Sequence, residues 1–136
     1  MKFFITGEVD APVGEKIRLV IIQIEPKINT LFSKKNYGSG ITYWGYITVC
    51  CAPEVYESGY FKEIRKYTKK ENEVDLRLRV GYEEMLKADK KEVFRLICMS
   101  ILEGVDIAEH ELKIKDFDFQ AFRDDLTSLF KKERWV

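Results

Sequence analysis

The strictest alternation of apolar and charged residues in the chain runs from Val74 to Val80, with the sequence VDLRLRV. In a β-strand, this pattern places all apolar side chains on one face and all charged side chains on the other. A parallel strand covered on both faces would instead be apolar throughout. The segment therefore predicts an antiparallel sheet that is covered on a single face, with the helices gathered on that face.

Three further segments favour strands. Residues 2–9 are short, apolar and followed by turn-forming residues, and residues 41–51 alternate until Pro53 ends the pattern. Residues 55–68 are rich in aromatic and charged residues and predict a strand with a break near Gly59. Together with residues 74–80, they predict a sheet of about four strands.

A first helix is predicted from apolar residues that recur at spacings of three and four. They are Ile17, Val20, Ile21, Ile24, Ile28, Leu31 and Phe32. Pro26 argues against one continuous helix, and the β-branched run at residues 20–22 leaves a strand open for residues 17–24. We favour a kinked or broken helix.

Two more helices are predicted in the C-terminal half. Asp89 is a candidate N-cap, Glu92 can complete a capping box, and Gly104 is a candidate stop, while residues 82–88 form a lead-in turn of helix. The last helix is expected at about residues 119–132. The order strand, helix, three strands, two helices predicts one α+β domain over residues 1–136, with a mainly antiparallel sheet and the helices on one face.

Composition supports a folded protein without a strong global charge. The chain is 46% apolar and 34% charged, and its 23 basic residues equal its 23 acidic ones. A net charge of zero gives no overall field that would favour nucleic acid or an anionic membrane. There is no secretory or membrane-spanning apolar run, and an odd set of three cysteines, Cys50, Cys51 and Cys98, indicates reduced thiols. These features predict a cytoplasmic protein.

No catalytic, cofactor or metal motif is apparent. His110 is the only histidine, which excludes a site with two histidine ligands, and its neighbours Glu109 and Glu111 form no known metal spacing. Gly38 and Gly40 lack the preceding strand and the third glycine of a dinucleotide-binding fingerprint. We therefore expect a protein that is not an enzyme and needs no cofactor.

Aromatic residues on the strand at 41–51 are candidates for binding a partner. Alternation places Trp44 and Tyr46 on the face opposite Tyr43 and Ile47. If the helices cover the face of Tyr43 and Ile47, Trp44 and Tyr46 stand on the open face, as interface anchors often do. The alternative is that they belong to a second small core under a loop.

Charge is segregated along the chain although its sum is zero. A basic block contains Lys62, Arg65, Lys66, Lys69 and Lys70; a larger acidic block contains Glu103, Asp106, Glu109, Glu111, Asp116, Asp118, Asp124 and Asp125. The acidic block is either a solvated helix face and loop or a surface that imitates nucleic-acid phosphates before a basic partner. The partner-binding residues predicted from both features are Trp44, Tyr46, Asp106, Glu109, Glu111, Asp116 and Asp118.

Three segments carry a resemblance to a known class of proteins. The opening MKFFITGEVD, the strand ITYWGYITVCC and the helix EVFRLICMSILEGV are together similar to small immunity proteins of bacterial polymorphic toxin and contact-dependent growth inhibition systems. The resemblance implies a cytoplasmic, non-enzymatic inhibitor that binds a cognate toxin domain. Many such toxins are nucleases with basic clefts, which would suit the acidic block. The neutral net charge departs from the strongly acidic balance of many nuclease inhibitors.

Two alternatives remain at the level of the sequence. One is a small enzyme that uses paired carboxylates in a cleft between helices and sheet, and the other is a nucleic-acid-binding accessory protein. Neither has a motif, and we expect no direct contact with nucleic acid or membrane.

Overall fold

The computed structural model describes residues 1–8, 11–51 and 60–133. Within these ranges, the side chains at 8, 11–12, 47–51, 60–66, 78–79 and 82 are not described. The elements in chain order are β1 (Lys2–Glu8), α1 (Ala11–Lys34), β2 (Tyr43–Cys51), β3 (Tyr60–Thr68), β4 (Glu73–Gly81), α2 (Tyr82–Lys87), α3 (Lys90–Glu111) and α4 (Phe119–Lys132). The predicted order is confirmed, and the lead-in turn is a short helix, α2.

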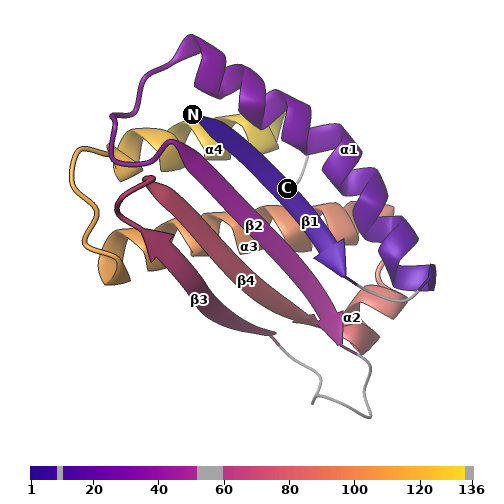
Figure 1. Ribbon diagram of the computed structural model, residues 1–136. Helices are drawn as coiled ribbons and strands as arrows, with labels where there is room; N and C mark the ends of the chain where they lie inside the picture. Colours follow the sequence, from indigo (N-terminus) through magenta and orange to yellow (C-terminus); the bar gives the residue numbers. More distant parts are fainter. Residues whose placement is uncertain (9–10, 52–59, 134–136) are drawn as a thin grey trace.

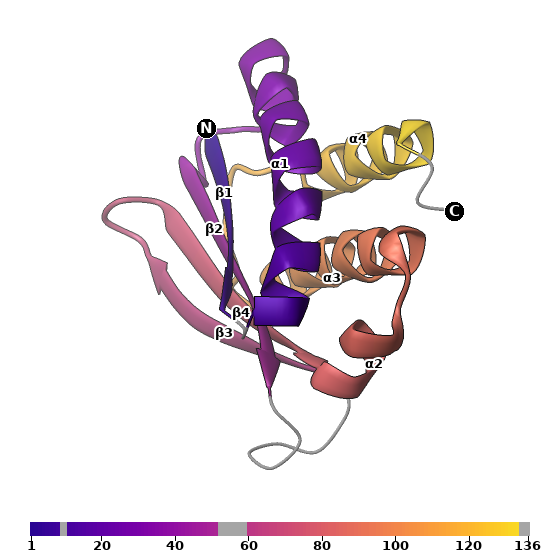
Figure 2. The same ribbon diagram turned by 90° about the vertical axis from the view of Figure 1, so that its right-hand side faces the viewer.

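The molecule has two layers. Figure 1 looks onto the sheet with the helices α1, α3 and α4 behind it, and the side view in Figure 2 shows all three on the same side. The predicted α+β class with helices on one face is confirmed. The other face of the sheet carries none of the described helices.

The sheet is mixed, so the expectation of a mainly antiparallel sheet is wrong in this respect. Its strand order is β1-β2-β4-β3; β1 and β4 both pair parallel to β2, and only β3 pairs antiparallel, with β4. The alternation from Val74 to Val80 indicates that one face of the sheet is covered. The same alternation arises in a parallel or an antiparallel strand. Strand direction follows from the connections: α1 joins β1 to its parallel neighbour β2, whereas a short turn joins β3 to its antiparallel neighbour β4.

The predicted helical stripe of α1 faces the core. Ile17, Val20, Ile24, Ile28 and Phe32 are buried, so this segment is helix and not strand. The helix is not broken at Pro26, which lies inside the continuous helix α1. Pro26 is on the exposed side of this helix. The backbone bond that proline removes is therefore lost where water can replace it.

The third helix is longer than the sequence suggested. Gly104 is not its stop, because α3 continues to Glu111 and Gly104 is buried inside it. A Cβ at Gly104 would lie 3.0 Å from both Leu76 Cδ1 and Tyr46 Cε2. The glycine thus allows α3 to lie close against β2 and β4.

The ends of the C-terminal helices follow the capping prediction in part. Asp89 is the N-cap of α3, and its carboxylate accepts a hydrogen bond from the Glu92 N–H at 2.8 Å. The predicted capping box does not form, because the Glu92 side chain pairs with Arg95. The predicted final helix is confirmed as α4, with Asp118 as its N-cap.

Candidate functional site

Trp44 and Tyr46 lie in the core, so their predicted placement on the open face is wrong. They are 0% and 1% exposed, beneath the helix layer. The Trp44 ring centroid lies 5.5 Å from that of Phe122 on α4, and Tyr46 stacks on Phe3 of β1 at 6.4 Å. These contacts leave neither ring available to a partner while the fold is intact.

The sequence carried a signal that distinguishes the two faces of β2. Gly45 lies on the face of Tyr43, so the middle of that face has no side chain to pack against helices. The opposite face carries Trp44 and Tyr46 next to each other without such a gap. The large uninterrupted face is the one that the helices cover.

The open face of the sheet presents two rows of residues in register. The first row is Lys2, Tyr43 and Glu73, and the second is Phe4, Gly45 and Asp75, each contributed by β1, β2 and β4 in turn. Phe4 is 42% exposed, although it is a large apolar residue. Sequence analysis did not single out this surface.

A hollow of about 190 Å³ opens over Gly45. Its lining includes Phe4, Thr6, Tyr43, Glu73 and Asp75. Burial raises the pKa of the Tyr43 hydroxyl, and the nearby carboxylates of Asp75 and Glu73 raise it further. The carboxylates of the hollow thus oppose, together with burial, a negative charge on the Tyr43 hydroxyl.

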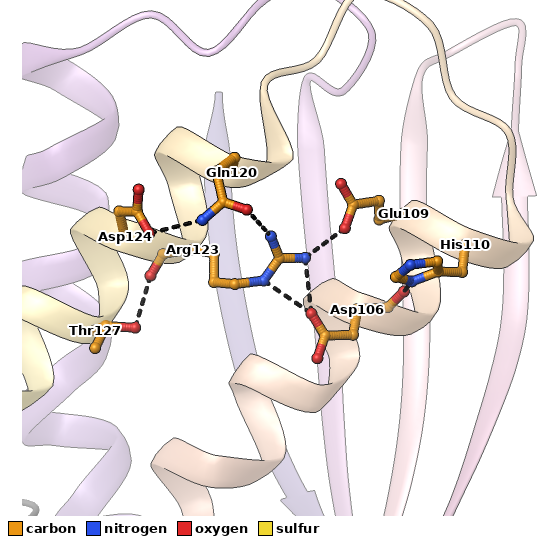
Figure 3. A network of polar contacts seen from close by, with 7 residues as sticks. All are labelled: Asp106, Glu109, His110, Gln120, Arg123, Asp124 and Thr127. Atoms are coloured by element: carbon orange, nitrogen blue, oxygen red, sulfur yellow. Dashed lines mark hydrogen bonds and ion pairs between the residues drawn. The ribbon is translucent and has the colours of Figure 1, made fainter.

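Two of the predicted acidic residues converge on one cation from α4. Arg123 Nε donates to Asp106 Oδ1 at 2.8 Å, and its Nη2 donates to Glu109 Oε1 at 2.5 Å (Figure 3). Gln120 Oε1 accepts from Arg123 Nη1 at 3.0 Å. Burial alone would lower the pKa of Arg123, but the bonds to Glu109 and Asp106 outweigh it and raise that pKa. The network ties the end of α3 to the start of α4.

The other three predicted acidic residues lie around the connection between α3 and α4. Asp116 accepts hydrogen bonds from the Ser39 N–H, at 3.0 Å, and from its hydroxyl, and these bonds lower the pKa of Asp116. Asp118 accepts from the Ala121 N–H at 3.0 Å as a helix cap. Glu111 is exposed at the end of α3 and forms no ion pair with another residue that the structure describes. Four of the five carboxylates therefore already have intramolecular partners.

Among the described side chains, His110 and Cys98 lie apart from any cluster that could form a chemical centre. His110 is exposed, and its Nδ1 lies 2.7 Å from the Asp106 carbonyl oxygen of its own helix (Figure 3). Cys98 is buried with a free thiol, and burial raises its pKa, while the side chains of Cys50 and Cys51 lie outside the described residues. In the described part of the chain, no three histidine, cysteine or acidic side chains gather in a way that could hold a metal ion.

Two lysines of the basic block have side chains in the described part of the chain. Lys69 and Lys70 are exposed, and the side chains of Lys62, Arg65 and Lys66 are not described. Among the helices of residues 11–34, 82–111 and 119–132, none has the length and apolar character that crossing a bilayer requires.

Comparison with known proteins gives one match. No curated protein and no solved structure matches the chain. A family model described as Immunity protein 44 matches residues 1–132, which is nearly the whole length of 136 residues. The chain therefore belongs to the Immunity protein 44 family, a family of immunity proteins of toxin systems.

Proposed function

We propose that this protein binds the toxin domain of its own toxin system in the cytoplasm and neutralises it by contact, without catalysing a reaction. The observation that carries the proposal is the family match over residues 1–132. An immunity protein needs a preformed surface that is complementary to one partner, because rigid surfaces lose little entropy on binding. The described residues offer such a surface around Arg123.

The carboxylates at the junction of α3 and α4 support a basic toxin surface as the partner. Asp106 is paired with Arg123, yet its side chain remains 55% exposed, so it has capacity to accept further hydrogen bonds. Glu111 is exposed at the end of the same helix. Asp106 and Glu109 are held by Arg123, which fixes their positions before a partner arrives.

We further propose that Asp106, Glu109, Glu111, Asp116 and Asp118 act mainly by orienting and accelerating encounter. Exposed charges raise association rates and contribute less to the lifetime of a complex. A toxin that acts on nucleic acid would present the matching basic surface. A nuclease is therefore the partner class that this surface fits best.

Three carboxyl groups with a shifted pKa give no support to the paired-carboxylate enzyme. A carboxyl group that acts as a general acid near neutral pH needs a raised pKa. Hydrogen bonds instead lower the pKa of Glu92 and of Asp116. For Asp125, burial raises the pKa, but hydrogen bonds from Lys35 and Tyr37 outweigh burial and lower it.

The proposal is tested with the toxin domain of the protein's own toxin system, which is sought in the reading frames next to its gene. Cells that express this domain should survive when they also express the immunity protein, and the purified proteins should form a stable complex in solution. Survival without any complex, or a complex that leaves the toxin fully active, would contradict neutralisation by contact.

The charged surface is tested with a matched pair of double variants. Asp106→Asn with Glu111→Gln should slow association with the toxin domain about tenfold at low salt and leave dissociation nearly unchanged. Glu83→Gln with Glu84→Gln on α2, at the opposite end of α3, removes the same charge and should have little effect. Equal effects of the two variants would show that only net charge matters and not this surface.

A further inference from the structure

The hollow on the open sheet face is built from the strand register. Gly45 is the centre of its row, with Phe4 on one side and Asp75 on the other, and Tyr43 and Glu73 stand in the row next to it. The missing side chain at Gly45 leaves the floor open, which is why the hollow lies there. Glycine inside a strand is unfavourable by itself and commonly marks the close approach of another group.

The walls of the hollow combine two chemistries. Phe4 and Tyr43 supply aromatic rings, and Asp75 and Glu73 supply carboxylates. Among the residues whose side chains the structure describes, neither carboxylate forms an ion pair or a side-chain hydrogen bond, not even with Lys2 or Arg77 on the same face. Aromatic faces and carboxylates share one preferred ligand, which is a cationic side chain.

We propose that the hollow over Gly45 receives a lysine or arginine side chain of the toxin domain. This inference rests on the proposed function, because it names the part of the toxin that one site binds. The charged end of the side chain would reach Asp75 and Glu73. The methylene chain of a lysine, or the planar guanidinium group of an arginine, would lie against Tyr43 and Phe4. A pocket that desolvates one anchor in this way governs mainly the lifetime of a complex.

The competing explanation is that Gly45 only makes room for the Tyr43 ring. A Cβ at residue 45 would lie 3.0 Å from Tyr43 Cε1 and 3.2 Å from Asp75 Oδ1. Both neighbours are side chains that can shift by a few tenths of an ångström, so Gly45→Ala should fold and fill the floor of the hollow. The competing explanation predicts an unchanged complex for this variant, whereas an occupied hollow predicts faster dissociation.

The main test uses the cognate toxin domain, identified as described for the proposed function, and the kinetics of its complex. Asp75→Asn keeps the shape of the side chain and removes its charge, and it should speed dissociation at least about tenfold. Gly45→Ala and Phe4→Ala should each speed dissociation several-fold. Glu84→Gln on α2 removes the same charge elsewhere and should remain within about twofold of the wild type. Circular dichroism and urea unfolding check that each variant is folded. If Asp75→Asn does not fold, the dissociation rate of Gly45→Ala decides whether the hollow is occupied in the complex.

Substitution of each basic residue of the toxin by methionine identifies the cation. One such toxin variant should weaken binding to the wild type and have little further effect on Asp75→Asn, which is the signature of a direct pair in a double-mutant cycle. Lys66 on β3 pairs with Asp75 in the strand register, so Lys66→Met tests whether a lysine of the chain itself neutralises Asp75. Lys66→Met should leave dissociation unchanged or slow it. Faster dissociation would show that Lys66, and not a toxin residue, neutralises Asp75, and would overturn the proposal.

The outcomes separate this inference from the proposed function. A wild-type protein that neither binds nor neutralises the toxin domain contradicts both. A wild type that binds, with Asp75→Asn and Gly45→Ala no different from Glu84→Gln, overturns the hollow as a site and leaves the immunity function intact.

Discussion

Asn29 on α1 forms two hydrogen bonds with the backbone of Phe3 on β1. The Phe3 N–H donates to Asn29 Oδ1 at 2.9 Å, and Asn29 Nδ2 donates to the Phe3 carbonyl oxygen at 2.8 Å. One turn earlier on the helix, Glu25 Oε2 accepts from the Ile5 N–H at 2.8 Å. Because β1 is an edge strand, these side chains occupy positions at which another strand could pair.

Asn29→Leu should lower the free energy of unfolding by about 2 kcal/mol, because it removes both hydrogen bonds to Phe3, as well as one to the Glu25 carbonyl oxygen, and leaves part-buried backbone groups of Phe3 unpaired. Asn29→Asp keeps the acceptor for the Phe3 N–H and loses only the donor, so its loss should be smaller. Urea unfolding measures both. If Asn29→Leu is as stable as the wild type, these hydrogen bonds do not stabilise the edge strand β1.

Gly104→Val should destabilise the protein by about 1–3 kcal/mol, although valine favours a helix more than glycine does. The added side chain would meet Leu76 and Tyr46, which a Cβ alone already approaches to 3.0 Å. Thermal or urea unfolding gives the change in stability. Leu102→Val on the same helix, at a half-buried position, reports the general effect of a β-branched residue there.

The fold was predictable where a pattern depends on local physics. The stripe from Ile17 to Phe32, the N-cap at Asp89 and the last helix follow from side-chain periodicity and capping. Strand direction was not predictable, because the same alternation at residues 74–80 arises in a parallel or an antiparallel strand that is covered on one face. The helix stop at Gly104 failed because its glycine serves packing against the sheet.

Asp125 should make stability depend on acidic pH. Lys35 Nζ donates to Asp125 Oδ1 and the Tyr37 hydroxyl donates to Oδ2, both at 2.8 Å. Although burial raises the pKa of Asp125, these bonds outweigh burial and lower it below its ordinary value of 3.8. A lowered folded-state pKa contributes stability above the unfolded pKa, and this contribution is lost as pH falls through the folded value.

The stability difference between the wild type and Asp125→Asn should therefore be largest near neutral pH and shrink below about pH 3.8. Urea unfolding at a series of pH values measures it. Asp124→Asn, at the neighbouring position, controls for the loss of one negative charge on α4. A constant difference for Asp125→Asn across this range would show that the bonds from Lys35 and Tyr37 do not favour the ionised carboxylate.

The predicted binding residues show why a surface is harder to infer than a fold. Alternation separated Trp44 and Tyr46 from Tyr43 correctly, but it does not state which face the helices cover. The acidic residues were placed near one helix junction, yet most of them have internal roles that depend on partners far along the chain, such as Ser39 for Asp116. Tertiary contacts of this kind leave no local pattern in a sequence.

The core position of Trp44 gives a prediction that contrasts two aromatic residues on the two faces of the sheet. Trp44 is 0% exposed and contacts Phe117 and Phe122, so Trp44→Ala should cost about 3–5 kcal/mol of stability through the cavity it leaves. Phe4 is 42% exposed on the open face, so Phe4→Ala should cost less than about 1 kcal/mol.

The two variants should also differ in how they affect the complex with the toxin domain. Trp44→Ala should lose binding only to the extent that it unfolds, so the folded fraction, measured by circular dichroism, should account for the loss. Phe4→Ala should remain folded and dissociate faster, because Phe4 forms part of the wall of the hollow over Gly45. A folded Trp44→Ala protein that dissociates faster than Phe4→Ala would contradict the hollow over Gly45 as the site that governs the lifetime of the complex.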